Sequence, residues 1–261
     1  MRTMRTMVRL LSLLLVALLL VPSASRAARG FGTTDGVAST DVITTTYASG
    51  STTFSWMLSV WRTGPGGANL GRMFSKDNGT TERREFYHSE GSATYNLRVS
   101  WTGTDGEWTI ARPTAGAWHH ILITYNGGSA ANDPIIYVDG SSVTVTRTDA
   151  PTGALETGTM TAYHIGNSSL ASTRVFDGRL AEVAVWESLL TSGNATSLWN
   201  GGRGARANTI GTPVQYWRLC GASPEPNEMG GGSSASVTGT ASIQTSHVCS
   251  GFTFHIEKLM E

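Results

Sequence analysis

Residues 118–140 read WHHILITYNGGSAANDPIIYVDG and determine how the rest of the chain is interpreted. Two runs rich in β-branched and aromatic residues are joined by a polar loop that contains glycine, and the second run ends at Asp139-Gly140. Apolar residues then resume in alternation at Val143 and Val145. An Asp-Gly pair between such runs is typical of a β-hairpin, because both residues tolerate the positive φ angles of a type I′ turn. The segment therefore predicts antiparallel β-sheet.

Short strand candidates separated by turn signals continue along the chain in both directions. The stretch TFSWMLSVW at 53–61 alternates a heavy apolar face with a lighter one, which is the pattern of a sandwich strand. The other candidates are 37–46, 72–76, 84–88, 94–101, 107–112, 118–126, 134–138, 142–147, 160–166, 176–187 and 214–219. No alternation of strands with helices is visible, so a two-sheet antiparallel sandwich or jelly roll is expected rather than a parallel sheet.

One short helix is predicted within TSGNATSLWNGG, residues 191–202. Thr191 or Ser192 can cap its start, and Ala195, Leu198 and Trp199 fall on one face. A helix of two turns depends on packing against the sheet for its stability.

The first 27 residues have the composition of a secretory signal peptide. Three arginines precede a twelve-residue apolar run at 10–21, and Ser25 and Ala27 supply small residues at the −3 and −1 positions of a cleavage site. An uncleaved membrane anchor is the alternative, but spanning a bilayer takes about 20 apolar residues. We therefore expect a secreted, extracellular or cell-surface protein that is cleaved after Ala27 and has no membrane segment afterwards.

The charge of the mature chain argues against binding to nucleic acid or to an anionic membrane. The removed segment holds four arginines and no acidic residue, so 15 basic and 19 acidic residues remain, a net charge of −4. Such a balance gives no general electrostatic attraction to nucleic acid or to an anionic membrane. No nucleic-acid partner is expected.

Cys220 and Cys249 are the two cysteines of the chain. In a secreted protein an even number of cysteines favours a disulfide, although two unpaired thiols are the alternative. The pair would close a loop rich in Gly, Ser and Pro and stabilise the fold by about 3–4 kcal/mol. We therefore divide the mature chain into a domain at 28–219 and a disulfide-closed segment at 220–261 that packs on it.

A glycosidase on a sandwich needs two facing carboxylates, and the sequence offers no such pair. Glu182 and Glu187 are five residues apart, so they point to opposite faces of a regular strand. The other two pairs are Glu82 with Glu85, in a polar loop, and Glu225 with Glu228, between the cysteines. All three pairs are interpreted as exposed charges.

Histidine and serine motifs do not indicate catalysis either. His119 and His120 are adjacent and therefore face opposite ways, and neither belongs to a zinc-binding motif. His120 shares a face with Trp118, so an interior histidine is expected. No nucleophile elbow or glycine-rich phosphate loop occurs. The chain is predicted not to be an enzyme.

Calcium is the one inorganic ligand that stays open. Asp35, Asp77, Asp139 and Asp177 lie near turns, where carboxylate and backbone oxygens could converge on the ion. The alternative is that aspartate is simply a turn residue, and no metal site is assigned.

Eight tryptophans are many for a chain of this size. A sandwich core needs aromatic mass, and Trp56 and Trp118 are assigned to it by alternation. Trp61, Trp101 and Trp108 border loops and are the better candidates for an exposed platform on which sugar rings stack.

Several blocks, in order, resemble the laminin G-like domains of the concanavalin A-like jelly rolls. They are WHHILITYNG at 118–127, IYVDG at 136–140, HIGN at 164–167, FDGRLAEVAVW at 176–186 and the helix region at 189–201. The resemblance covers about residues 32–219. It implies two antiparallel sheets packed face to face, often with a structural calcium at one rim. Many members carry an acidic residue before Glu182 where this chain has Ala181, so the resemblance does not extend to a calcium site on that strand.

The resemblance also implies a class of function. Members are commonly secreted or surface modules that bind glycans, proteins or cell surfaces, and similar versions occur in bacteria and bacteriophages. We expect a secreted non-catalytic binding or adhesion module that recognises carbohydrate or a cell-surface protein. A structural or attachment protein of an envelope or virion is the alternative, and a glycosidase on the same fold is less favoured.

Overall fold

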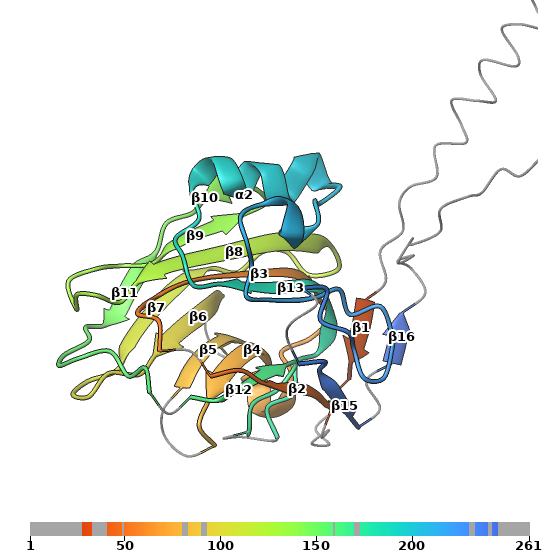
Figure 1. Cartoon of the computed structure of the whole chain (residues 1–261), viewed down its shortest axis with the longest axis horizontal. Helices are drawn as coiled ribbons and strands as arrows, with labels where there is room; N and C mark the ends of the chain where they lie inside the picture. Colours follow the sequence, from red (N-terminus) through yellow and green to blue (C-terminus); the bar gives the residue numbers. More distant parts are fainter. Residues whose placement is uncertain are drawn as a thin grey trace, which may run out of the picture.

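The computed structural model describes residues 28–32, 41–48, 50–79, 83–89, 93–158, 160–169, 173–229, 233–239 and 242–244. The predicted signal peptide at 1–27, Asp35, Glu82 and Cys249 lie outside these residues. Within them, two sheets of eight strands each pack face to face, as Figure 1 shows. The two-sheet antiparallel sandwich predicted from the sequence is therefore confirmed.

The first sheet, sheet A, has the three longest strands at its centre. Its order is β10 (Ser141–Ser142), β9 (Ile135–Val138), β8 (Trp118–Asn126), β3 (Thr53–Arg62), β13 (Gly178–Trp186), β1 (Ala28–Phe31) and β16 (Ser242–Gln244), and β14 (Gln215–Trp217) also pairs with β13. The turn between β9 and β10 has φ 52° at Asp139 and φ 78° at Gly140, as the Asp-Gly signal predicts.

The second sheet, sheet B, faces sheet A across the core. Its order is β11 (Thr146–Asp149), β7 (Gly106–Ala111), β6 (Thr94–Val99), β5 (Arg83–His88), β4 (Arg72–Asp77), β12 (Ala162–Ile165), β2 (Val42–Thr46) and β15 (Ser236–Thr238). The predicted strand at 142–147 is wrong as a single element, because its first residues extend sheet A as β10 and its last residues cross to sheet B as β11.

The space between the sheets is filled by large aromatic residues. Trp56 of β3 lies in the middle of this core, with ring centroids 4.8 Å from Phe54 and 4.8 Å from Phe74 of the opposite sheet. The prediction that Trp56 is a core residue is confirmed.

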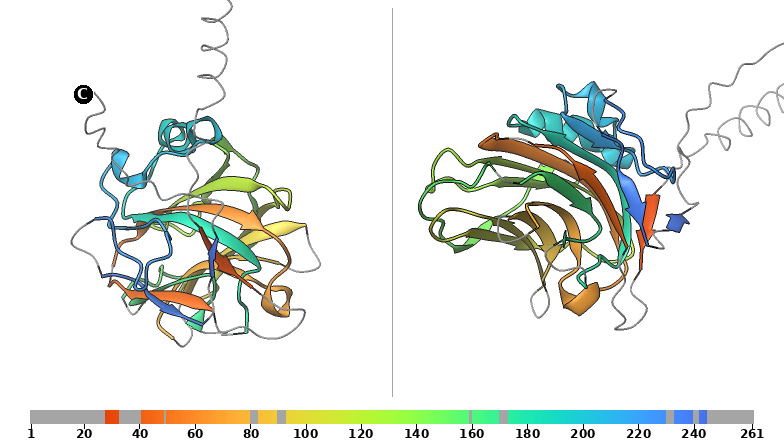
Figure 2. Two further views of the ribbon diagram at one scale, coloured as in Figure 1. Left: turned by 90° about the vertical axis from the view of Figure 1, so that its right-hand side faces the viewer. Right: turned by 60° about the horizontal axis from the view of Figure 1, so that its bottom comes forward.

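Helix α2 (Ser192–Trp199) covers part of the outer face of sheet A (Figure 2). Of the two predicted caps, Thr191 and Ser192, the structure uses Thr191, which forms a capping box with Asn194. Its buried residues Ala195 and Leu198 belong to a second apolar cluster on that face, together with Trp186 of β13. Three short 3₁₀ turns complete the described helices: η1 (Gly67–Asn69), η3 (Asn200–Gly202) and η4 (Ala207–Thr209). None of the helices in the described residues is long and apolar enough to cross a membrane.

Both ends of the described chain are built into the sheets. β16 pairs with β1, and β15 pairs with β2. A buried ion pair fixes this arrangement, because Arg29 Nε donates to Glu225 Oε1 at 2.6 Å. Glu225 also accepts the backbone N–H groups of Cys220 and Gly221 at 3.1 and 2.8 Å. The pairing of Cys220 with Cys249 stays a prediction, because Cys249 lies outside the described residues.

Two cations, Lys76 and Arg84, lie in the interior near the start of β3. Arg84 donates to the carbonyls of Ser51 at 3.1 Å and Glu156 at 3.3 Å. Lys76 is 1% exposed, and its Nζ lies 5.3 Å from the ring centroid of Tyr163. Burial and the neighbouring charge of Arg84 lower the pKa of Lys76 from its ordinary 10.5 to about 8.

We predict that Arg29→Met lowers the free energy of unfolding by about 3–5 kcal/mol, because it leaves the Glu225 carboxylate buried without its counter-ion. Urea denaturation of the mature chain measures this. Arg147→Met is the matched control, since its partner Asp133 is 55% exposed and such pairs contribute about 1 kcal/mol or less. Equal effects of the two substitutions would contradict the assigned role of Arg29.

We also predict that the free energy of unfolding rises between about pH 8 and pH 9.5. In this window the unfolded chain keeps a proton on Lys76 that the folded protein has released, so raising the pH favours the folded state. The rise should reach up to about 2 kcal/mol, since one pH unit is worth about 1.4 kcal/mol. Urea denaturation of Lys76→Met should give no such rise and a higher stability near pH 7. A wild-type curve parallel to that of the variant would refute the prediction.

Candidate functional site

The tryptophans divide into buried and partly exposed groups. Trp56, Trp101, Trp108, Trp186 and Trp217 are buried. Trp61, Trp118 and Trp199 are partly exposed. Three tryptophans, Trp61, Trp101 and Trp108, were predicted to lie at the surface. Only Trp61 is partly exposed.

The sequence predicts that Trp101 and Trp108 lie at the surface, but both are buried. Gly106 makes room for the Trp108 indole, since a Cβ at Gly106 would lie 2.3 Å from Trp108 Cη2. The Trp108 Nε1–H donates to Asp133 Oδ1 at 2.6 Å. Trp101 forms an isolated antiparallel bridge with Leu155, which lies in the core. Both tryptophans contact residues that are distant in sequence. Their positions next to loops therefore did not indicate exposure.

The structure also corrects the prediction for Trp118, which is partly exposed and does not lie in the core. It was assigned to the core by alternation, yet the alternate residues of β8, among them Ile121 and Ile123, face the space between the sheets. The face that carries Trp118 is the outer one, and it is also apolar at Leu122 because the helix layer covers it there. His120 is buried on this same outer face, so it is an enclosed histidine outside the main core.

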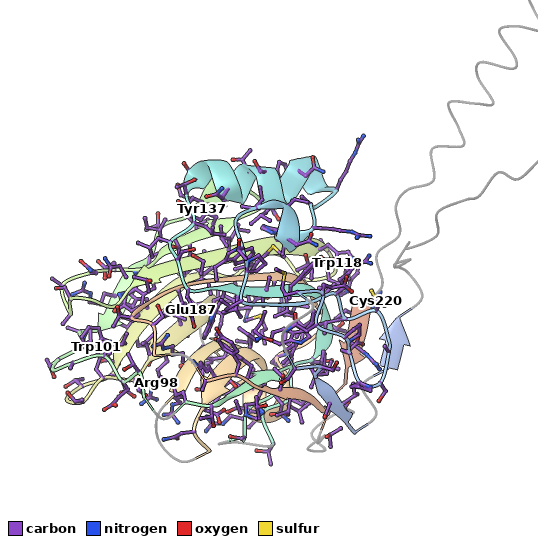
Figure 3. The ribbon with its side chains drawn as sticks, in the orientation of Figure 1. Arg98, Trp101, Trp118, Tyr137, Glu187 and Cys220 are labelled. Atoms are coloured by element: carbon purple, nitrogen blue, oxygen red, sulfur yellow. The ribbon has the colours of Figure 1, made fainter. Side chains whose placement is uncertain are left out.

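Trp61 and Trp118 are direct neighbours on the outer face of sheet A. They form the last cross-strand pair of β3 and β8, with ring centroids 6.0 Å apart and planes at 62°. Arg179 of β13 pairs with Trp61 on the other side, and its guanidinium carbon lies 5.4 Å from the Trp61 ring centroid. We call these three residues the tryptophan face. In Figure 3, Trp118 lies toward one end of the sandwich and the buried Trp101 toward the other.

A row of buried polar residues continues from the tryptophan face toward the helix layer. Ser59 and His120 form the next outward-facing cross-strand pair, and Glu182 follows on β13. Glu182 has φ 52° and sits where the register of β13 with β3 shifts, which marks a β-bulge. Its carboxylate accepts the Tyr216 hydroxyl and lies 3.7 Å from Arg218 Nε. The bulge turns an acidic side chain to the outer face without moving the core residues around it.

The glutamates considered for hydrolysis do not form a catalytic pair. Glu182 faces outward with Tyr216, whereas Glu187 contacts the Tyr47 hydroxyl at 3.2 Å near the start of β3. Glu182, Glu85 and Glu225 are predicted to be exposed, but all three are buried. Glu85 and Glu225 are each only 1% exposed, and each neutralises a buried arginine. Those arginines are Arg72 for Glu85, at 3.2 Å, and Arg29 for Glu225.

Of the aspartates considered for calcium, Asp77 and Asp139 are held by hydrogen bonds within the fold. Burial alone would raise the pKa of Asp77, but hydrogen bonds from His164, Ser169 and the Gly79 N–H lower it below its ordinary value. Within the described ranges, no group of three His, Cys, Asp or Glu side chains is placed to hold a metal ion. Asp35 lies outside those ranges.

Asp139 ties the β9–β10 turn to β8. His119 Nδ1 lies 2.8 Å from Asp139 Oδ2, and the His120 N–H donates to Asp139 Oδ1 at 2.9 Å. His119 Nε2 lies 3.2 Å from the hydroxyl of Thr114, which is exposed in the loop before β8. Both carboxylate oxygens are thus used to fix the strand that carries Trp118.

Two arginines, Arg62 and Arg112, lie near Tyr95 where β3 ends. Arg62 ends β3, and Arg112 follows β7 of the opposite sheet. Burial raises the pKa of Tyr95 to about 12, and the charges of both arginines act against this rise because they lie near its hydroxyl. Arg112 also contacts His88 Nε2.

The outer face of sheet B differs from that of sheet A, because its polar groups are linked mainly to one another. The Tyr87 hydroxyl and the Asn96 amide both donate to Glu107 Oε1, at 2.7 and 2.6 Å. Arg98, labelled in Figure 3, binds Asp105 Oδ2 through two nitrogens at 3.0 and 2.9 Å. These side chains satisfy each other, so the tryptophan face is the better candidate for a ligand.

Comparisons with known proteins agree with the fold. Residues 31–195 match a family model described as the concanavalin A-like lectin/glucanases superfamily. The native heptameric SAP-like pentraxin from Limulus polyphemus is 15% identical, with a TM-score of 0.53 over 85% of this chain and 99% of that one. A candidate carbohydrate-binding protein from Bacteroides ovatus is 14% identical, with a TM-score of 0.58. That match covers 85% of this chain but only 59% of the Bacteroides ovatus protein. No curated protein matches the chain by sequence.

Proposed function

Because the chain belongs to the concanavalin A-like lectin/glucanases superfamily, we propose that it is a secreted, non-catalytic binding module for carbohydrate on a cell surface or polymer. The proposed contact is the tryptophan face, Trp61, Trp118 and Arg179. Secretion is proposed from the signal-peptide composition of the first 27 residues.

The observation that carries the proposal is the partly exposed pair of indoles on a strand face. Trp61 and Trp118 lie next to each other outside both apolar clusters, whereas most other tryptophans of the chain are buried. Tryptophan is enriched where a protein meets a partner, because it offers a large apolar surface together with a polar N–H group. The apolar face of a pyranose ring suits such a surface.

The engagement of the acidic residues supports binding rather than hydrolysis. Retaining and inverting glycosidases need two carboxyl groups about 5–9.5 Å apart on either side of one bond. Glu182 and Glu187 lie on opposite sides of sheet A, and Glu182 is held by Tyr216 and Arg218. Glu182 and Glu187 therefore both have structural roles in the fold.

The central β-strands hold the proposed contact in a fixed geometry. Trp61 and Trp118 end a nine-residue register between β3 and β8, and Asp139 fixes the adjacent His119 and His120. A rigid aromatic contact loses little side-chain freedom when a ligand binds.

We predict that the mature chain, residues 28–261, is retained by at least one class in a broad polysaccharide and glycan panel. Trp61→Ala and Trp118→Ala should each weaken binding about 10-fold or more, because loss of an anchoring aromatic side chain costs about 1–2 kcal/mol or more. Affinity electrophoresis or calorimetry measures this, in the presence of calcium and of a chelator.

Tyr47→Ala is the matched control for these variants. Tyr47 is also a partly exposed aromatic residue, but it contacts Glu187 near the start of β3, about 25 Å along the strand from Trp61. Its loss should leave binding unchanged. A panel without any retained glycan, or tryptophan variants that bind like the wild type, would disprove the proposed function.

A further inference from the structure

The tryptophan face is one row of side chains deep. Trp118, Trp61 and Arg179 lie side by side on β8, β3 and β13. At the end of the sandwich β8 begins with Trp118, and β3 ends one residue after Trp61. In the other direction the next outward-facing pair is Ser59 with His120, and both residues are buried. A ligand on this face therefore meets a single row of partly exposed side chains.

The row is also short across the strands. β9 pairs with residues 121–124 of β8 and does not reach Trp118. On the opposite side, Arg179 pairs with Gly30 of β1, which has no side chain to offer a ligand. Among the described residues of this row, the aromatic surface thus consists of Trp61 and Trp118.

The two indoles form a corner and not a flat platform. Their planes are inclined by 62° with ring centroids 6.0 Å apart, in the edge-to-face manner that aromatic pairs prefer. Their positions directly opposite each other on neighbouring strands hold this arrangement. The guanidinium carbon of Arg179 lies 5.4 Å from the Trp61 ring centroid, so it covers part of that ring. A flat sugar ring can lie parallel to only one of two planes that are inclined so steeply.

The shape of the corner selects the number of sugar units that it can hold. Stacking of a chain along its length is favoured by parallel aromatic faces, since each successive pyranose ring packs on a face of its own. The corner instead fits one ring, whose apolar face packs on one indole while its edge contacts the other. The burial of Ser59 and His120 means that the outer surface beside the corner is already covered on the side of the helix layer. The rest of a bound glycan must therefore leave in the opposite direction, as it does from a chain end or a branch.

We infer that Trp61 and Trp118 together hold a single sugar unit, so that the ligand is a glycan recognised through one terminal or branching residue and not through successive units along its chain. This inference rests on the proposed function and specifies the class of glycan that the same site takes.

The test compares ligands of different length from the polymer that the panel retains. The probes are its hexasaccharides, prepared by partial hydrolysis, and the methyl glycosides of its constituent sugars. NMR titration of the ¹⁵N-labelled mature chain measures both affinities, including weak ones. The hexasaccharides should bind no more than about 3-fold tighter than the best methyl glycoside, whereas stacking of successive units would add about 10-fold for each further unit.

The tryptophan variants show whether the two indoles act on one unit. Trp61→Ala and Trp118→Ala should each weaken the binding of the methyl glycoside by the same factor as that of the hexasaccharide, about 10-fold. If each indole held a unit of its own, the methyl glycoside would still bind to the remaining indole and lose about 2-fold at most.

Tyr47→Ala serves as the control here too, and it should leave both affinities unchanged. Variants are compared only if they melt at the wild-type temperature. Trp61→Phe and Trp118→Phe, which keep an aromatic ring at each position, decide the test if an alanine variant does not fold, because the same equality between the two ligands is expected for them.

Three results would overturn the inference. Hexasaccharides that bind at least 10-fold tighter than every methyl glycoside would indicate an extended site and leave the proposed function standing. Binding of a methyl glycoside that survives the loss of either tryptophan would indicate two separate contacts. A panel without any retained glycan would overturn the inference together with the proposed function.

Discussion

The pairing of β3 with β8 is the constraint on which the rest of the structure depends. Nine consecutive residue pairs run from Thr53 with Asn126 to Trp61 with Trp118. Because side chains alternate along a strand, this one register sends Trp56 into the core and Trp61 to the outer face. A slip by one residue would exchange the two faces of β8. The core and the proposed binding surface are therefore consequences of the same set of backbone hydrogen bonds.

β13 extends sheet A from β3 toward the strands at the two ends of the described chain. One edge of β13 pairs with β3, and the other edge is shared by β1 and β14. The bulge at Glu182 falls between the segments that pair with β1 and β14. It places an extra residue on the outer face, where Tyr216 and Arg218 hold it, while Leu180 and Val183 stay in the core. The bulge at Glu182 thus allows β13 to pair with three strands, β3, β1 and β14.

Features set by local chemistry could be predicted from the sequence. The Asp139-Gly140 turn, the capped helix and most strands follow from turn residues and periodicity. The faces of β8 could not be assigned, because a helix layer makes the outer face apolar as well. Trp101 and Trp108 were misplaced because distant residues bury them. β1 and β16 are too short to give a pattern and are defined by their partners. The tryptophan face was therefore only half predicted, through Trp61.

The antiparallel pairing of β1 with β16 has a consequence for how this fold is joined to other proteins. Ala28 lies opposite Gln244, so the two ends of the described fold are one strand spacing apart, about 5 Å (Figure 1). A fold with adjacent ends can be inserted into a loop of a host protein without stretching that loop. The same proximity permits a circular permutation in which a short linker joins the two ends and new ends are opened in a surface turn.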